Sequence, residues 1–154
     1  MSDEDFLRMA VEEALEGVRS GDGGPFGCVI IKDGEVVGRG HNRVLADIDP
    51  SAHGEIVAVR DACRRLRTID LSGCVIYSSS EPCPMCEAAI RWARADRVVY
   101  AATVNGAEEL GGFMDRDMYD GMRGGKDLVP SCFIRIEGRL EPFREYRRMG
   151  GPGY

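Results

Sequence analysis

Three stretches of the chain carry apolar residues at the spacing of an amphipathic helix. Between positions 4 and 19 these residues recur at i, i+3, i+4 and i+7, which predicts a helix with one buried face. The same spacing returns over 56–66 and over 84–95, where Pro84 is tolerated because the first turn of a helix needs no amide hydrogen bond. We therefore expect these three helices, and a short closing helix over 143–149.

Short apolar runs lie between these helices and predict strands. The first run, 28–31, precedes Lys32-Asp33-Gly34, a hairpin signal that leads to a second strand over 35–38. Three further runs predict strands at 74–77, 97–102 and 132–136. Hairpins pair strands antiparallel and helical crossovers pair them parallel, so we expect an α/β fold with a mixed five-stranded sheet and helices on both faces, in three α/β/α layers.

Glycine becomes frequent after position 103, which disfavours regular structure there. We expect loops over 103–130 with one short helix near 115–122. Residues 140–154 are interpreted as a C-terminal tail. No repeat or linker divides the chain, so residues 1–154 are expected to form a single domain.

The composition supports a folded domain and disfavours two classes of partner. Of the 154 residues, 44% are hydrophobic and 30% are charged, which is ordinary globular usage. The formal net charge of −6 is opposite in sign to that of most proteins that bind nucleic acid phosphates. No apolar run approaches the roughly 20 residues that cross a bilayer, and the first residues are acidic, so we expect a cytoplasmic protein without a membrane partner.

Six cysteines are present, but only Cys83 and Cys86 are close together in the sequence. They open a predicted helix, so one helical turn places both sulfurs side by side, and the helix N-terminus favours the thiolate form. We interpret this pair as a metal or redox element. The other cysteines are expected to be buried apolar residues, namely Cys28, Cys63, Cys74 and Cys132.

His53-Gly54-Glu55, at the start of the preceding predicted helix, completes a metal-binding set. One imidazole with the sulfurs of Cys83 and Cys86 suits Zn²⁺. Three protein ligands leave one position for water, as in catalytic zinc sites, where the metal lowers the pKa of that water to about 7. Glu55 lies two residues from the His53 ligand, and we expect it to carry protons from the water to the substrate.

H-x-E followed by P-C-x-x-C resembles the signature of the zinc nucleobase deaminases, in which the glutamate is the acid and base and not a ligand. From Gly27 to about Tyr100 the chain is similar to the cytidine deaminase superfamily. The matching segments are Gly40-His41-Asn42, Ala52 to Glu55, Glu81 to Cys86 and Ala89 to Arg94. The bacterial guanine deaminase branch is the most similar, on residues 89–94 with Gly112-Phe113, Tyr119 and Pro142-Phe143.

The resemblance implies a zinc-dependent aminohydrolase that releases ammonia from a small aminated heterocyclic base, guanine or a close analogue. It also implies that Asn42 hydrogen-bonds the edge of the base, and that Phe26 and Trp92 form walls of the pocket. Members of this branch are homodimers in which the C-terminal segment crosses to the partner subunit. Tyr154 occupies the place of the aromatic residue that closes the partner's pocket.

Two positions depart from the family pattern. Some members carry an acidic proton carrier directly after Gly-Phe, where this chain has Met114, which leaves Asp115, Glu81 and Glu141 as candidates for that role. Gly54 is the middle residue of H-x-E, as in fungal cytosine deaminases, whereas most purine and tRNA members have alanine. Gly54 therefore bears on which base is bound.

Three alternatives stay open. Gly54 favours a deaminase of cytosine or a related pyrimidine or triazine. A tRNA adenosine deaminase needs a basic surface, for which the candidates are Arg64, Arg65, Arg67, Arg144, Arg147 and Arg148. A CxxC redox or structural zinc module is the third, with His41 as the remaining histidine. We expect one catalytic Zn²⁺ per subunit, a small-molecule nucleobase substrate and no nucleic acid partner.

Overall fold

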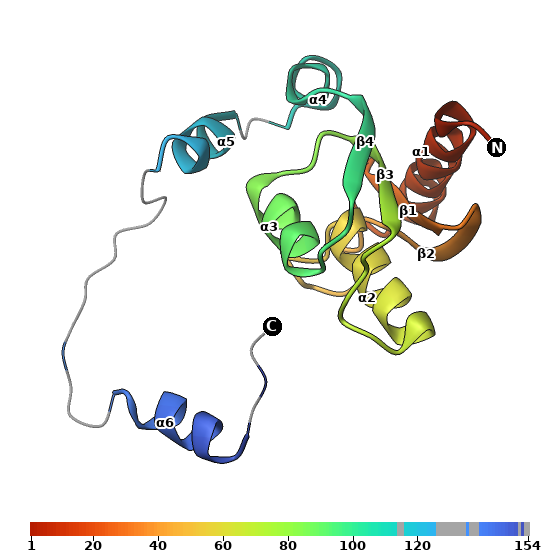
Figure 1. Cartoon of the computed structure of the whole chain (residues 1–154). Helices are drawn as coiled ribbons and strands as arrows, with labels where there is room; N and C mark the ends of the chain where they lie inside the picture. The colour runs from red at the N-terminus through yellow and green to blue at the C-terminus, as the bar shows by residue number, and fades with distance from the viewer. Residues whose placement is uncertain (114–115, 126–134, 136–138, 151, 153–154) are drawn as a thin grey trace.

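The computed structural model of the protein describes residues 1–113, 116–125, 135, 139–150 and 152. Within these residues the chain forms one four-stranded sheet and six α-helices (Figure 1). In chain order the elements are α1 (Asp3–Ser20), β1 (Gly27–Lys32), β2 (Glu35–His41), α2 (Gly54–Leu66), β3 (Cys74–Ser80), α3 (Pro84–Trp92), β4 (Arg97–Ala102), α4 (Val104–Gly111), α5 (Arg116–Arg123) and α6 (Glu141–Arg148).

The sheet is mixed, as predicted. Its strands lie in the order β2-β1-β3-β4, with β1 antiparallel to both of its neighbours and β3 parallel to β4. The hairpin between β1 and β2 and the crossover through α3 account for the two kinds of pairing. The described sheet has four strands where five were expected: the fifth expected strand, 132–136, lies outside the described residues apart from Arg135.

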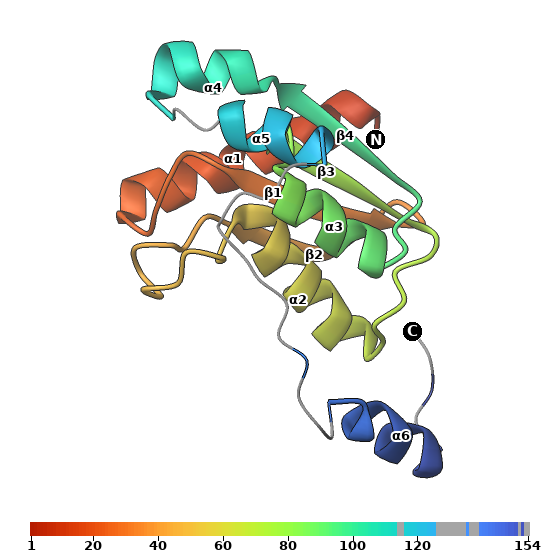
Figure 2. The ribbon, with the colours of Figure 1, turned by 90° about the vertical axis from the view of Figure 1, so that its left-hand side faces the viewer.

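Alternation along β1 and β3 divides the core between the two faces of the sheet, because successive side chains of a strand point to opposite faces. The core under α1 consists of Phe6, Ala10, Val29, Ile31 and Tyr77. The core under α2 and α3 consists of Cys28, Ile30, Ala58, Ala62, Leu71, Cys74, Ile76, Ile90 and Ala93. Helices therefore cover both faces of the sheet, which confirms the three-layer prediction (Figure 2).

Three of the four cysteines expected to be apolar core residues are described, and all three pack in the core. Cys28 and Cys74 are fully buried, and Cys63 is partly buried against the same cluster. Cys132 lies outside the described residues.

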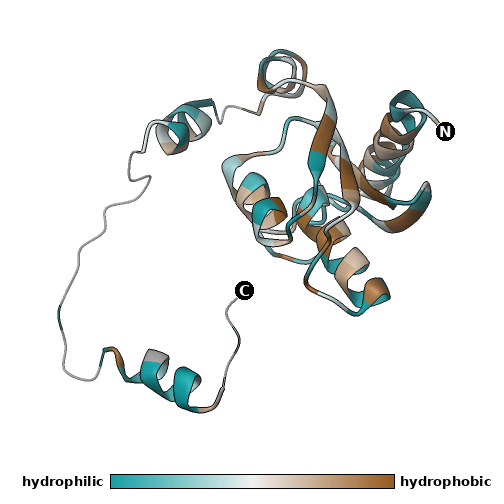
Figure 3. Cartoon of the chain, in the orientation of Figure 1, coloured by the Kyte–Doolittle hydropathy of each residue, from teal (hydrophilic) through white to brown (hydrophobic). Residues whose placement is uncertain are grey.

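Helix α4 was not predicted, because Gly106 and Gly111 suggested a loop. Its first amide, Val104 N, donates a 3.0 Å hydrogen bond to Glu81 Oε2, so a side chain from a distant part of the sequence satisfies the helix N-terminus. Helices α5 and α6 agree within two residues with the short helices that were expected near 115–122 and over 143–149. The described side chains of α6 are exposed and mostly hydrophilic (Figure 3).

None of the described helices combines the length and the apolar character that crossing a membrane requires.

Two glycines on β2 allow α2 to pack directly on the strand backbone. A Cβ at Gly38 would lie 2.7 Å from both the Ala58 carbonyl oxygen and Ala62 Cβ, and one at Gly40 would lie 2.7 Å from Ala58 N. Real Cβ atoms do not approach backbone atoms this closely. The glycines therefore set how near α2 lies to the sheet, and with it the position of the helix N-terminus.

We expect Gly38→Ala to lower the free energy of unfolding by about 1–3 kcal/mol, because the added methyl group forces α2 away from β2. Urea unfolding of the zinc-loaded protein measures this. Gly106→Ala is the matched control: no atom lies within 4 Å of its Cβ position, and alanine in a helix is favourable by up to about 1 kcal/mol. Equal stability of the two variants would contradict the packing argument.

Candidate active site

Two helices that pack on the same face of the sheet begin at the same place. His53 is the N-cap residue of α2, Cys83 is the N-cap residue of α3, and Cys86 lies in the first turn of α3. His53 Nδ1 lies 3.5 Å from Cys83 Sγ and 3.6 Å from Cys86 Sγ. One nitrogen and both sulfurs lie within 4.8 Å of one another, so the three residues could hold a metal ion.

The chemistry of these donors fits zinc. An imidazole nitrogen and two thiolates are the soft and borderline ligands that Zn²⁺ prefers. Hydrogen bonds from Cys86 and His53 lower the pKa of the Cys83 thiol well below its ordinary value, which favours its thiolate form. The pKa of Cys86 is raised because its thiol donates to Cys83 and is buried. A bound cation would favour the thiolate of both residues.

Glu55 lies beside the metal-binding group. It is the second residue of α2, and its carboxylate is buried. The Ser78 hydroxyl donates to Glu55 Oε1 at 2.9 Å, and Cys86 Sγ lies 3.5 Å from Glu55 Oε2. Burial raises the pKa of Glu55, although these hydrogen bonds oppose the shift. A carboxyl group in this environment is well suited to take up and release a proton.

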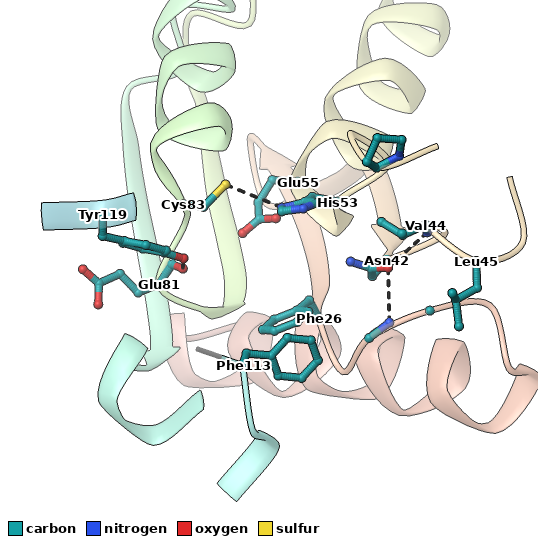
Figure 4. A pocket seen from close by; sticks show the side chains of 13 residues that line it. Phe26, Asn42, Val44, Leu45, His53, Glu55, Glu81, Cys83, Phe113 and Tyr119 are labelled. Atoms are coloured by element: carbon teal, nitrogen blue, oxygen red, sulfur yellow. Dashed lines mark hydrogen bonds between the residues drawn. The ribbon is translucent and has the colours of Figure 1, made fainter. Parts of the chain in front are cut away.

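A cavity of about 440 Å³ opens in front of these residues (Figure 4). His53, Glu55 and Cys83 line one part of it, and Asn42 lines another. Its volume is in the range of pockets that bind small molecules. Further lining residues that the sequence did not single out as pocket residues are Gly23, Gly24, Val44, Leu45, Pro50, Phe113 and Tyr119.

Asn42 is held with its amide nitrogen toward this cavity. Its side-chain oxygen accepts hydrogen bonds from Gly24 N at 3.2 Å and from Val44 N at 3.1 Å. Since two backbone donors occupy the oxygen, the carboxamide orientation is determined, and the NH₂ group faces the pocket (Figure 4). The pocket thus contains a buried donor for an acceptor atom of a ligand.

Aromatic rings form an apolar wall beside Asn42. Phe26 and Phe113 pack edge to face, with ring centroids 4.9 Å apart and an interplanar angle of 75°. Tyr119 from α5 packs against Cys83 and Cys86 on the side of the metal-binding group. Only spatial proximity marks Phe113 and Tyr119 as pocket residues, because both follow the last described strand in a segment that was expected to be mostly loop.

Glu81 lines the pocket, but its carboxylate already has partners. Besides Val104 N, it binds the Arg123 guanidinium, with Arg123 Nη2 3.1 Å from Glu81 Oε1. The Tyr119 hydroxyl donates to the Glu81 carbonyl oxygen at 3.4 Å. Glu81 therefore ties α4 and α5 to the end of β3. The role of Glu81 as a proton carrier stays a prediction.

Trp92 and Gly54 are not among the described residues that line this cavity. Trp92 is 68% exposed at the end of α3, and its place as a wall of the pocket stays a prediction. Gly54 does not line the pocket either: a Cβ there would lie 3.0 Å from the Phe26 carbonyl oxygen and 3.3 Å from Gly27 Cα. Glycine at this position allows α2 to begin close to the backbone at the start of β1. This close packing explains Gly54 without reference to the identity of the base.

The remaining candidates are placed as follows. Met114, Asp115 and Tyr154 lie outside the described residues. Glu141 is exposed on α6, where it pairs with Arg144. His41 Nε2 lies 2.8 Å from Asp22 Oδ2, and His41 does not belong to the described metal-binding group.

A three-layer fold that brings an imidazole, two thiols and a buried glutamate together at a small-molecule pocket defines a zinc-dependent hydrolytic deaminase. Residues 1–102 match the family model of the cytidine and deoxycytidylate deaminase zinc-binding region. The chain belongs to this family, and it is a zinc-dependent nucleobase aminohydrolase.

Two kinds of deaminase are similar to this chain. The guanine deaminase of Bacillus subtilis is 43% identical over 151 residues, which cover 97% of this chain and 96% of that protein. The tRNA-specific adenosine deaminase of Aquifex aeolicus is 41% identical over 102 residues, which cover 66% of this chain and 67% of that protein. The crystal structure of the Bacillus subtilis guanine deaminase superposes with a TM-score of 0.91, covering 100% of this chain and 99% of that one.

We expect the wild-type protein to bind about one zinc ion per chain, and Cys83→Ala and Cys86→Ala to bind none after dialysis against a chelator, because two ligands hold zinc far less tightly than three. Elemental analysis of the purified proteins measures this. Cys63→Ala, which removes a partly buried thiol away from the site, and Glu55→Ala should both keep the metal. Zinc retained by Cys83→Ala would refute the proposed ligand set.

Proposed function

We propose that this enzyme removes the exocyclic amino group of guanine or a close analogue by hydrolysis and releases ammonia. The observation that carries the proposal is the position of Glu55. Its buried carboxylate lies beside the His53, Cys83 and Cys86 donors and lines a pocket whose opposite side presents the Asn42 amide. Support for guanine comes from the Bacillus subtilis guanine deaminase, which is similar over 97% of this chain. The tRNA-specific adenosine deaminase of Aquifex aeolicus is similar over 66% of it.

In this proposal His53, Cys83 and Cys86 hold the zinc ion. When bound, Zn²⁺ supplies Lewis-acid activation of the attacking water. Glu55 accepts a proton from that water on its carboxylate. It delivers this proton to the ring nitrogen next to the attacked carbon. Glu55 then accepts the second proton from the added hydroxyl oxygen and passes it to the departing amino group. Water has then added its oxygen to the ring, and ammonia has left.

Ser78 and the apolar core keep Glu55 ready for this role. The hydrogen bond from the Ser78 hydroxyl holds Glu55 Oε1, which leaves Oε2 toward the metal-binding group. Burial favours the protonated carboxyl group, so Glu55 can keep the proton until the amine leaves.

Recognition of the base falls to the other side of the pocket. The Asn42 NH₂ group donates to an acceptor atom on the edge of the ring, of which guanine offers N3, N7 and O6. Phe26 and Phe113 provide the apolar surface against which a flat heterocycle packs. We retain Asp115 as the second proton carrier and Tyr154 as a residue that closes the pocket of a partner subunit; both stay predictions.

The alternatives lose support from the structure. Gly54 favoured cytosine, but it contacts the backbone of β1 and not the pocket. Three of the six arginines that were candidates for a tRNA-binding surface form ion pairs with neighbouring acids, namely Arg65 with Asp61, Arg144 with Glu141 and Arg148 with Glu145. We therefore propose that nucleic acid is not a partner.

We further propose that the chain is one domain over residues 1–154 that works as a homodimer in the cytoplasm, with residues 140–154 crossing to the partner subunit. A reducing compartment fits the five described cysteines, all of which are free thiols.

We expect guanine to be deaminated with a kcat/KM at least about 10-fold above those of cytosine and an adenosine-containing tRNA anticodon stem, a difference of about 1.4 kcal/mol in transition-state stabilisation. Ammonia release from each substrate measures this. Glu55→Ala should lower kcat on guanine by about 10²–10⁴-fold while zinc stays bound, because the general acid and base is lost. Faster turnover of cytosine would instead support the alternative substrate.

We expect sedimentation equilibrium of the zinc-loaded protein to report the mass of two chains. Trp92 is 68% exposed, and a large exposed aromatic side chain is the kind of surface that a second subunit covers. A monomer at concentrations where the enzyme is active would contradict both the dimer and the exchange of residues 140–154.

A further inference from the structure

The residues on either side of Asn42 both bind the same carboxylate. His41 Nε2 lies 2.8 Å from Asp22 Oδ2, and Arg43 Nη1 lies 3.1 Å from the same oxygen. The backbone carbonyl of Asp22 also accepts hydrogen bonds from the amides of residues 45–46, at 3.1 and 2.9 Å. Asp22 therefore holds the segment that carries Asn42 on both sides of this residue, at His41 before it and at Arg43 and residues 45–46 after it.

The loop that begins with Asp22 also orients the Asn42 side chain. Gly24 N donates to Asn42 Oδ1, and Asn42 N donates to the Phe26 carbonyl oxygen at 2.8 Å. A Cβ at Gly23 would lie 2.1 Å from Asn42 Oδ1, so this loop lies directly against the carboxamide. A shift of the loop would move the Gly24 N donor that holds Asn42 Oδ1, and the direction of the NH₂ group would change.

The charged groups around His41 form a partly buried network behind the pocket. Its ring lies between two carboxylates: Asp22 at Nε2, and Glu13, whose Oε2 is 3.5 Å from Nδ1. Arg39 pairs with Glu13 at 3.2 Å, and Arg43 pairs with Asp22, so both acids are balanced. Asp22, His41 and Arg43 do not line the cavity. Any influence of this network on the substrate must pass through Asn42 and the loop.

We propose that Asp22 is a positioning residue for base recognition: by binding His41, Arg43 and the amides of residues 45–46, it holds the Asn42 NH₂ group in the direction of the base. The inference rests on the proposed role of Asn42 in binding the substrate. It leaves the metal ligands and Glu55 untouched, because they belong to α2 and α3.

The test is a double-mutant cycle on the zinc-loaded protein. Hypoxanthine, which is guanine without its 2-amino group, cannot be deaminated but keeps the ring acceptors, so its inhibition constant reports binding separately from turnover. This constant is measured with kcat and KM for guanine, zinc content and melting temperature. The variants are Asn42→Ala, Asp22→Ala and the double substitution.

We expect Asp22→Ala and Asn42→Ala each to raise the inhibition constant and KM by about 3–10-fold, the range that loss of one hydrogen bond produces. For Asp22→Ala, kcat should stay within about twofold of wild type and zinc content should be unchanged. In the Asn42→Ala background, Asp22→Ala should change the inhibition constant by less than about twofold, because two changes that act through one interaction are not additive.

Asp47→Ala is the matched control. Asp47 also pairs with Arg43, at 2.9 Å, but its side chain is more exposed than that of Asp22. This variant should bind hypoxanthine as wild type does. If Asp22→Ala does not fold, Asp22→Asn replaces it in the cycle, since asparagine keeps the size of the side chain and removes the charge.

Two outcomes would overturn the inference while the proposed function stands: no change in Asp22→Ala when Asn42→Ala weakens binding, or the same fold-change from Asp22→Ala in both backgrounds. If Asn42→Ala itself binds hypoxanthine as wild type does, the proposed recognition by Asn42 fails, and the role of Asp22 fails with it.

Discussion

The meeting of two helix N-termini at one end of the sheet is the constraint on which the rest of this structure depends. Helices α2 and α3 each contribute their N-cap residue, His53 and Cys83, and Cys86 follows one turn later. Neither N-cap side chain caps its own helix, so both are available to a metal. The close packing of α2 on glycines of β2 is what brings the imidazole within reach of the sulfurs.

The same arrangement places the Glu55 carboxylate in a buried position, where ionisation costs free energy. Glu55 is buried beside two thiols. Its carboxylate accepts hydrogen bonds from the Ser78 hydroxyl at 2.9 Å and from the Cys86 thiol at 3.5 Å. Burying a charge without a full set of partners is unfavourable, and the raised pKa of Glu55 expresses that cost. An ordinary structural role gives no reason to keep a carboxyl group there, whereas proton transfer requires one with this property.

How much could be predicted from the sequence follows from how local each feature is. The metal-binding group was predictable because H-x-E and C-x-x-C each lie within one helical turn, and the core strands were predictable from their apolar runs. Helix α4 was missed because Glu81, distant in sequence, satisfies its first amide. The exposure of Trp92 was not predictable, because an aromatic residue at the end of a helix carries no signal of which side it faces.

The lining of the pocket comes from two parts of the chain, one within the segment that matches the family model and one beyond it. The metal-binding group and Glu55 lie within residues 1–102, the part that matches the family model. Phe113 and Tyr119, which complete the wall, lie beyond it. A guanine deaminase and a tRNA-specific adenosine deaminase are both about two fifths identical to this chain, but over very different lengths. Replacing the segment after β4 changes the wall of the pocket and leaves the proton-transfer machinery in place, so one metal centre can serve different bases.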